Sequence, residues 1–100
     1  MKNNTNKVPQ AKGMYYFALN VIRNIKVGEL DSNEYGYSPY EEGDDFNNDE
    51  NKIVDFLETD ILTAEEYEEM EEYGLKATNP ERIEYYIGLL EQFIDNNKRL

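Results

Sequence analysis

Carboxylates are the side chains of this sequence that are most able to bind or react, and they are densest in residues 65–72, EEYEEMEE. Six glutamates in eight helical residues would span about 12 Å, or about 2 Å of axis per charge. Duplex DNA carries one charge per about 1.7 Å of axis, so the two charge densities are comparable. In a helix that is stabilised by surface ion pairs, Lys usually follows Glu by four residues. Here Glu69 follows Glu65 by four residues and Glu72 follows Glu68 by four, so both pairs repel. The run therefore indicates imitation of a polyanion, and the alternative is a plain solvated acidic face.

A second group of carboxylates lies upstream, in an acidic segment that also contains tyrosines. Aromatic rings among carboxylates suit an interface with an Arg-rich protein, because tyrosine adds contact area and cation–π attraction while the acids steer the approach. The alternative is that these tyrosines anchor the segment to the domain. The predicted partner-binding residues are the phosphate-like Glu41, Glu42, Asp44, Asp45, Glu65, Glu66, Glu68, Glu69 and Glu72, with Tyr37 and Tyr40 as anchors.

Clustered Asp and Asn residues also raise the question of calcium. Four residues coincide with positions 1, 3, 6 and 12 of an EF-hand loop, namely Asp31, Asn33, Gly36 and Glu42. Tyr35 and Pro39, however, stand at positions 5 and 9, where such a loop needs ligands. We therefore predict no metal site and no cofactor, and a calcium-responsive module is the third-ranked hypothesis for function.

The sequence lacks the residue types that most enzymes use. It has no Cys and no His, which excludes disulfides, thiol catalysis and thiolate zinc sites and removes the commonest general base. Its two serines, Ser32 and Ser38, have no partner base, and there is no glycine-rich phosphate loop. Paired carboxylates can hydrolyse bonds only in a rigid cleft, which a domain of 100 residues seldom forms. We predict that the protein is not an enzyme.

The net charge of −12 is unevenly distributed along the chain. Residues 1–28 carry five basic residues and no acid, residues 29–72 carry eighteen acids and one base, and residues 73–100 carry four of each. An anionic surface disfavours binding to nucleic acid or to anionic membranes. We expect neither as a direct partner, and the absence of an apolar leader or membrane span predicts a cytoplasmic location.

Apolar spacing predicts a mainly α protein of three to four helices with a long acidic loop that has room for a short β-hairpin. The predicted organisation is a polar tail at 1–9 and one helical domain at 10–100, whose acidic block covers 29–72. Two one-sided stripes predict that the first and last helices pair as the scaffold. The stripes are Met14, Phe17, Ala18, Val21, Ile22 and Ile25, and Ile83, Tyr86, Ile87, Leu90, Phe93 and Ile94.

Glycines and capping residues predict where these helices begin and end. The first helix is expected from Gln10 to Val27 with Gly28 as its stop, followed by the acidic loop from Glu29 to Asn48 and a helix from about Asp49.

The next boundary is marked more specifically, because Thr63 and Glu66 match a capping box. That box begins a helix over Ala64–Tyr73, which Gly74 is expected to stop, and Asn79 is expected to cap the last helix.

In size, charge and lack of catalytic residues, the chain resembles the small acidic inhibitors that phages and mobile elements make against host nucleic-acid enzymes. These are the DNA-mimicking anti-CRISPR and anti-restriction proteins. The resemblance covers the acidic block and the overall size, and no motif identifies one family. It implies stoichiometric inhibition, in which the acidic block occupies the basic DNA-binding groove of a bacterial defence nuclease, either a CRISPR effector or a restriction enzyme.

The alternative function is a helical adaptor or transcription-regulatory partner that binds a protein through an apolar groove. In that case the acidity would serve solubility, and affinity would be nearly independent of salt.

Overall fold

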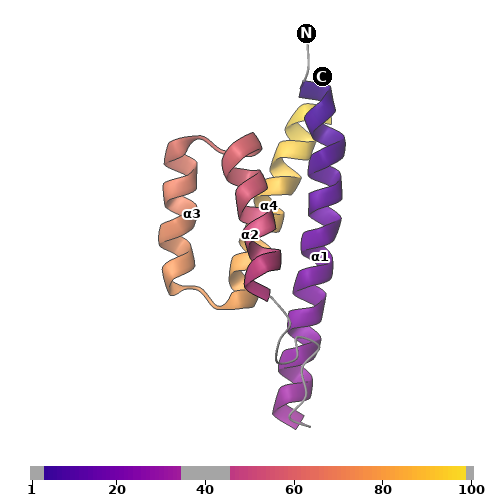
Figure 1. The fold of residues 1–100 in the computed structure, drawn as a ribbon, viewed down its shortest axis with the longest axis vertical. Coiled ribbons are helices and arrows are strands. Elements are labelled where there is room, and N and C mark those ends of the chain that lie inside the picture. Colours follow the sequence, from indigo (N-terminus) through magenta and orange to yellow (C-terminus); the bar gives the residue numbers. More distant parts are fainter. Residues whose placement is uncertain (1–3, 35–45, 99–100) are drawn as a thin grey trace.

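The computed structural model describes the backbone of residues 4–34 and 46–98 and the side chains of residues 7–25 and 46–97. These residues form four α-helices and one π-helical segment, and no strand occurs among them (Figure 1). The prediction of a mainly α protein is therefore confirmed. The elements are α1 (Asn4–Glu34), α2 (Phe46–Phe56), η1 (Leu57–Ile61), α3 (Ala64–Lys76) and α4 (Asn79–Lys98).

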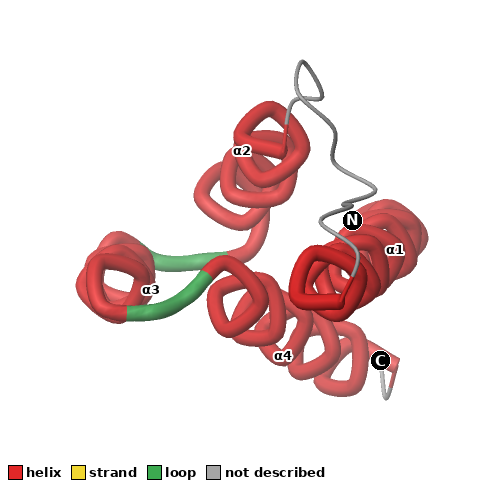
Figure 2. The backbone as a smooth tube through the Cα atoms, turned by 90° about the horizontal axis from the view of Figure 1, so that it is seen from below, coloured by secondary structure: helices red, strands yellow, loops and turns green. Residues whose placement is uncertain are grey.

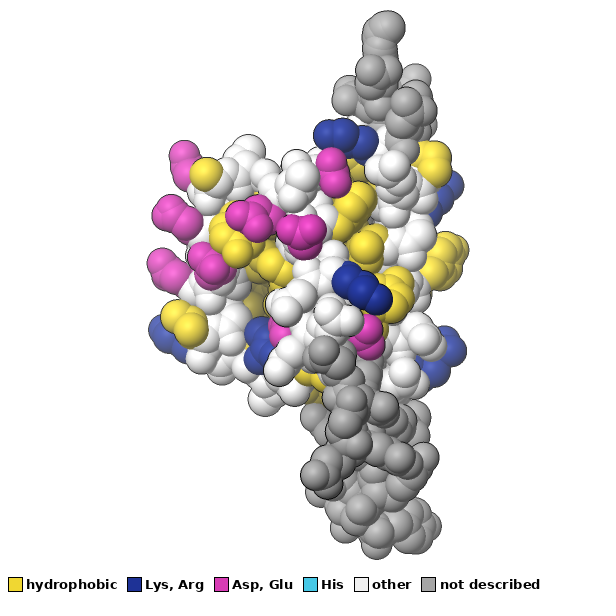
Figure 3. Space-filling view, viewed as in Figure 1, with side chains coloured by type: hydrophobic (Ala, Val, Ile, Leu, Met, Phe, Trp, Pro, Cys, Tyr) yellow, Lys and Arg dark blue, Asp and Glu magenta, His cyan; other side chains and the backbone are white. Residues whose placement is uncertain are grey.

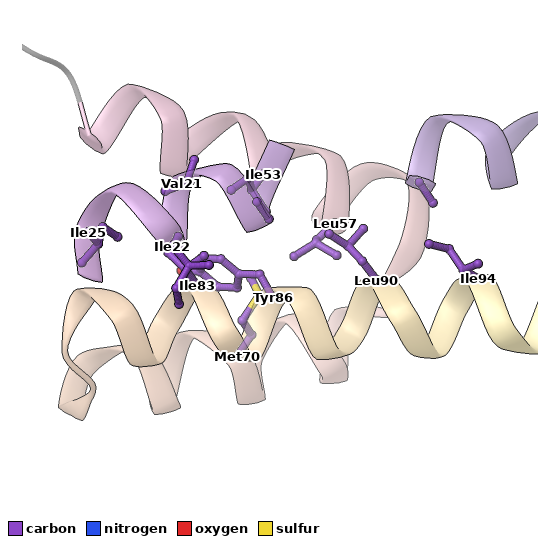
Figure 4. Close-up of a cluster of buried hydrophobic side chains, with 12 residues drawn as sticks. Val21, Ile22, Ile25, Ile53, Leu57, Met70, Ile83, Tyr86, Leu90 and Ile94 are labelled. Carbon is purple, nitrogen blue, oxygen red and sulfur yellow. The ribbon is translucent and has the colours of Figure 1, made fainter. Parts of the chain in front are cut away.

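Helices α1 and α4 form the scaffold, as their stripes predicted, because they share the most extensive contacts of any pair of elements. They run antiparallel and side by side (Figures 1 and 2). Ala11 and Ala18 of α1 are fully buried, and such small side chains let two helices approach closely. Helix α2 covers the pair, and its Ile53 is completely buried with Leu57 of η1 (Figure 4). Helix α3 contributes one buried side chain, Met70.

The predicted bounds of α1 were wrong at both ends. The helix begins at Asn4 instead of Gln10, because its first turns are docked: Lys7 forms an ion pair with Asp60 of η1 at 3.6 Å. The segment predicted as a polar tail is thus helical from Asn4 onward. At the other end the helix continues through Gly28 to Glu34. A helical glycine costs only about 1 kcal/mol relative to alanine, and no proline follows closely enough to end the helix.

The bounds predicted for the acidic loop, residues 29–48, were wrong at both ends. Residues 29–34 belong to α1, and α2 begins at Phe46 instead of Asp49. The part of the predicted loop that is left for a hairpin, residues 35–45, lies outside the described residues. Of the four residues in the partial EF-hand match, Asp31 and Asn33 belong to α1, and Gly36 and Glu42 lie outside the described residues.

Helix α2 passes directly into η1. The amide of Leu62 donates to the carbonyl of Leu57 at 2.8 Å, an i to i−5 bond that closes a wide π turn. Leu62 itself is extended, which ends the helix and turns the chain toward α3.

The capping box at the start of α3 is confirmed. Thr63 Oγ1 accepts from the Glu66 amide at 3.2 Å, and Glu66 Oε1 accepts from the Thr63 amide at 2.9 Å. A second capping box begins α4. The Thr78 amide donates to Glu81 Oε1 at 2.8 Å, and the Glu81 amide donates to Thr78 Oγ1 at 3.3 Å. The predicted cap, Asn79, is instead the first helical residue, because the Thr78 hydroxyl one position earlier accepts the hydrogen bond from the Glu81 amide.

The predicted end of α3 was also wrong. The helix continues through Gly74 to Lys76. A Cβ atom at Gly74 would lie 3.2 Å from Cδ of Arg82, so this glycine permits a close approach of α4 and does not stop the helix.

The Thr78 cap gives a first testable prediction. Thr78→Ala should lower the free energy of unfolding by about 1 kcal/mol, because the Glu81 amide loses its acceptor. Thr78→Ser keeps the hydroxyl and should stay close to the original stability. Urea denaturation followed by circular dichroism measures both variants. Equal losses for the two would contradict the assignment of Thr78 as the cap.

Candidate functional site

The strongest concentration of described charge is the outward side of α3. Met70 is 3% exposed and fixes the side of α3 that faces the core. Residues 65, 68, 69 and 72 follow the i, i+3, i+4, i+7 spacing on the opposite side, over about 10 Å of axis. We call this set the outer face of α3; its members are Glu65, Glu68, Glu69 and Glu72, all exposed.

No member of the outer face has an ion-pair or hydrogen-bond partner for its carboxylate within the described part of the chain. The repulsion predicted between Glu65 and Glu69, and between Glu68 and Glu72, is therefore not relieved by an ion pair in that part of the chain. Lys76 follows Glu72 by four residues but forms no ion pair with it. Glu66 differs, because its carboxylate is engaged at the Thr63 amide. Figure 3 shows carboxylates gathered along the free edge of α3. The arrangement can attract cations at short range, and nothing in it positions a nucleophile or a proton donor.

The structure therefore brings together five of the eleven predicted partner-binding residues, all of them on α3. The other six lie outside the described residues: Tyr37, Tyr40, Glu41, Glu42, Asp44 and Asp45.

Helix α3 is held to α4 by few contacts beyond Met70. The Tyr73 ring stacks on the Tyr85 ring with centroids 4.7 Å apart and an angle of 24° between the planes. Tyr73 nevertheless remains 42% exposed. The sequence does not reveal this pair, because no local spacing connects residues on two different helices.

A partly buried polar cluster joins α2 to α4 and was not predicted. The Arg82 guanidinium donates to both carboxylate oxygens of Glu50, from Nε at 2.6 Å and from Nη2 at 3.1 Å. Tyr86 donates its hydroxyl to Glu50 at 2.7 Å. Arg82 also donates to the Asn79 side chain at 2.5 Å and to the Ala77 carbonyl at 3.3 Å. This cluster therefore ties α2 both to α4 and to the connection from α3.

The contacts in this cluster shift the pKa values of its members. Burial alone would raise the pKa of Glu50, but hydrogen bonds from Arg82 and Tyr86 and the charge of Arg82 lower it below the ordinary 4.5. Burial, and then the bond to Glu50, raises the pKa of the Tyr86 hydroxyl. The bond to Glu50 is the main reason that the pKa of Arg82 rises. Near neutral pH the cluster is therefore an ion pair with a neutral phenol.

An open hollow of about 450 Å³ lies where α2, α3 and α4 meet. Its apolar lining includes Val54 of α2, Tyr67 and Met70 of α3, and Tyr86 of α4. Leu75 lines it as well and is 87% exposed, which makes it the most exposed large hydrophobic residue among those described. Sequence analysis missed Leu75, because at five residues after Met70 it does not lie on the side of α3 that faces the core.

Among the described residues, no group of three or more acidic side chains is arranged to hold a metal ion. None of the described helices is long and apolar enough to cross a membrane.

The fold and the outer face of α3 together define an acidic, mainly α-helical protein with an exposed carboxylate surface. Comparisons with protein-family models, with curated proteins and with solved structures found no match.

The pKa shift of Glu50 gives a second prediction. Because its folded-state pKa is lowered, the carboxylate stabilises the fold above the unfolded value of 4.5, and this stability is lost as pH falls through the folded pKa. Glu50→Gln should therefore lower the free energy of unfolding by about 2 kcal/mol at neutral pH and by much less at about pH 3. Urea denaturation at both pH values measures the difference.

Glu68→Gln is the matched control, since Glu68 is exposed and has no described partner. A loss at Glu50→Gln that is equally large at low pH would contradict the assigned ion pair.

Proposed function

We propose that the protein is a stoichiometric inhibitor that occupies the basic DNA-binding groove of a nucleic-acid enzyme. The observation that carries this proposal is the outer face of α3, four exposed carboxylates with no described basic partner. Their repulsion costs stability, at roughly 0.2–0.5 kcal/mol per i, i+4 pair. A helix with only a structural role gains nothing from this repulsion, whereas a helix that binds a basic surface needs these carboxylates free.

The spacing of the charges supports imitation of DNA. Four carboxylates over about 10 Å of axis give one charge per roughly 2.6 Å, compared with about 1.7 Å for the duplex. Lys and Arg side chains that line a DNA-binding groove could pair with carboxylates at such intervals, since long basic side chains adjust over a few ångströms. The target class that fits the resemblance in size and charge is a bacterial defence nuclease, a CRISPR effector or a restriction enzyme.

The third prediction concerns inhibition of such a nuclease. Neutralising all four residues of the outer face to Gln should weaken inhibition of a sensitive nuclease at least about thirtyfold, because several interfacial charge pairs are lost together. Cleavage of a labelled DNA duplex by purified restriction and CRISPR nucleases, titrated with the protein, measures the effect. The circular dichroism spectrum should remain helical.

The matched control changes the net charge by the same amount at neutral exposed positions away from α3. Its substitutions are Gln10→Lys, Asn20→Lys, Gln92→Lys and Asn96→Lys. This control should keep most of the inhibition. Equal weakening by both variants would show that only net charge matters, and full inhibition by the neutralised outer face would contradict the proposal.

A further inference from the structure

The hollow between α2 and α3 is part of a longer groove. A second open hollow, of about 440 Å³, shares Asn51, Val54 and Tyr67 with the first and extends toward η1. In Figure 3 hydrophobic side chains lie between the carboxylates over α3 and those over α2. We call the two hollows together the α2–α3 groove. It lies inward of the outer face of α3 and uses different residues.

The apolar part of the groove is only partly closed by the protein's own packing. Met70 and Tyr86 are buried beneath it, whereas Val54 and Tyr67 are half-buried. Leu75 projects at its edge with 87% of its surface exposed. A leucine this exposed gains free energy only when another apolar surface covers it.

Carboxylates border this apolar surface from both sides. Asp55 and Glu58 line it along α2 and η1, and Glu71 lines it along α3. Glu58 and Glu71 lie close enough to the Tyr67 hydroxyl that, after partial burial, they contribute to raising its pKa.

The basic side chains at the groove are already occupied elsewhere. Arg82 is paired with Glu50, and the ammonium of Lys52 lies over the Phe17 ring of α1, 5.8 Å from its centroid. The carboxylates of the border thus outnumber the cations that face it.

We propose that the α2–α3 groove binds a cationic amphipathic helix of a partner protein. Its apolar stripe would cover Val54, Tyr67 and Leu75, and its flanking Lys or Arg side chains would pair with Asp55, Glu58 and Glu71. A groove between two helices is a common receptor for a third helix. Two copies of this chain would not pair groove to groove, because both grooves have the same acidic border. The inference does not rest on the proposed function, since the outer face of α3 does not line the groove.

The test uses the full-length protein and a synthetic helical peptide of about 18 residues. The peptide has Leu at i, i+3, i+4 and i+7 spacing and Lys on both flanks; a control peptide has the same composition in scrambled order. Fluorescence anisotropy at about 150 mM salt, which weakens nonspecific attraction, measures the dissociation constants. The amphipathic peptide should bind at least about tenfold more tightly than the scrambled one.

Two protein variants locate the binding site. Leu75→Ser should weaken binding of the amphipathic peptide by about tenfold without unfolding the protein, because Leu75 is already exposed. The pair Asp55→Asn and Glu58→Gln should weaken binding more than the equally charged pair Glu65→Gln and Glu69→Gln on the outer face.

Equal affinity for the two peptides, an unchanged affinity in Leu75→Ser, or equal effects of the two charge pairs would each overturn the inference. Loss of nuclease inhibition in the outer-face variants would leave these results unaffected, so the two proposals fail separately.

Discussion

The ion pair between Arg82 and Glu50 is the interaction on which the placement of α2 and α3 beside α4 depends. One guanidinium contacts Glu50 of α2, the Ala77 carbonyl in the connection from α3, and Asn79 at the start of α4. Gly74 of α3 lies against its aliphatic carbons, where a larger residue would crowd it. Helix α3 has little else to hold it, because Met70 and the Tyr73–Tyr85 stack are its main attachments to α4. Both the direction of the outer face and the width of the α2–α3 groove therefore follow from where Arg82 lies.

Because the contacts of Arg82 hold α3 in place, this short helix presents two chemically different surfaces. The outer face of α3 carries four glutamates and is followed at the end of the helix by Lys76, whereas the inward flank of α3 combines Tyr67 and Leu75 with Glu71. Because an α-helix turns 100° per residue, the thirteen residues of α3 are enough to present both. Long-range electrostatic attraction and short-range apolar contact are thus available to two different ligands, or to two parts of one ligand.

Much of the fold could be predicted from the sequence, because apolar spacing and capping residues are local signals. The stripes of α1 and α4, the capping box at Thr63 and the outward spacing of the α3 glutamates all follow from helical periodicity. Glycine was a poor indicator of helix ends. Gly28 and Gly74 were both expected to end helices, and both lie within them. A glycine that ends a helix and one that makes room for a neighbour look identical in sequence. The Glu50–Arg82 pair and the groove join residues far apart in the chain, and no local spacing reveals them.

If the exposed carboxylates of α3 bind a basic DNA-binding groove, as proposed, the rate of association must depend on salt. The measurement is the association rate constant with an inhibited nuclease, by stopped-flow fluorescence, from about 50 to 500 mM salt. Steering by opposite charges predicts that this rate constant falls at least about tenfold over the range, while the dissociation rate constant changes far less. An association rate constant that does not depend on salt would contradict binding through the α3 carboxylates.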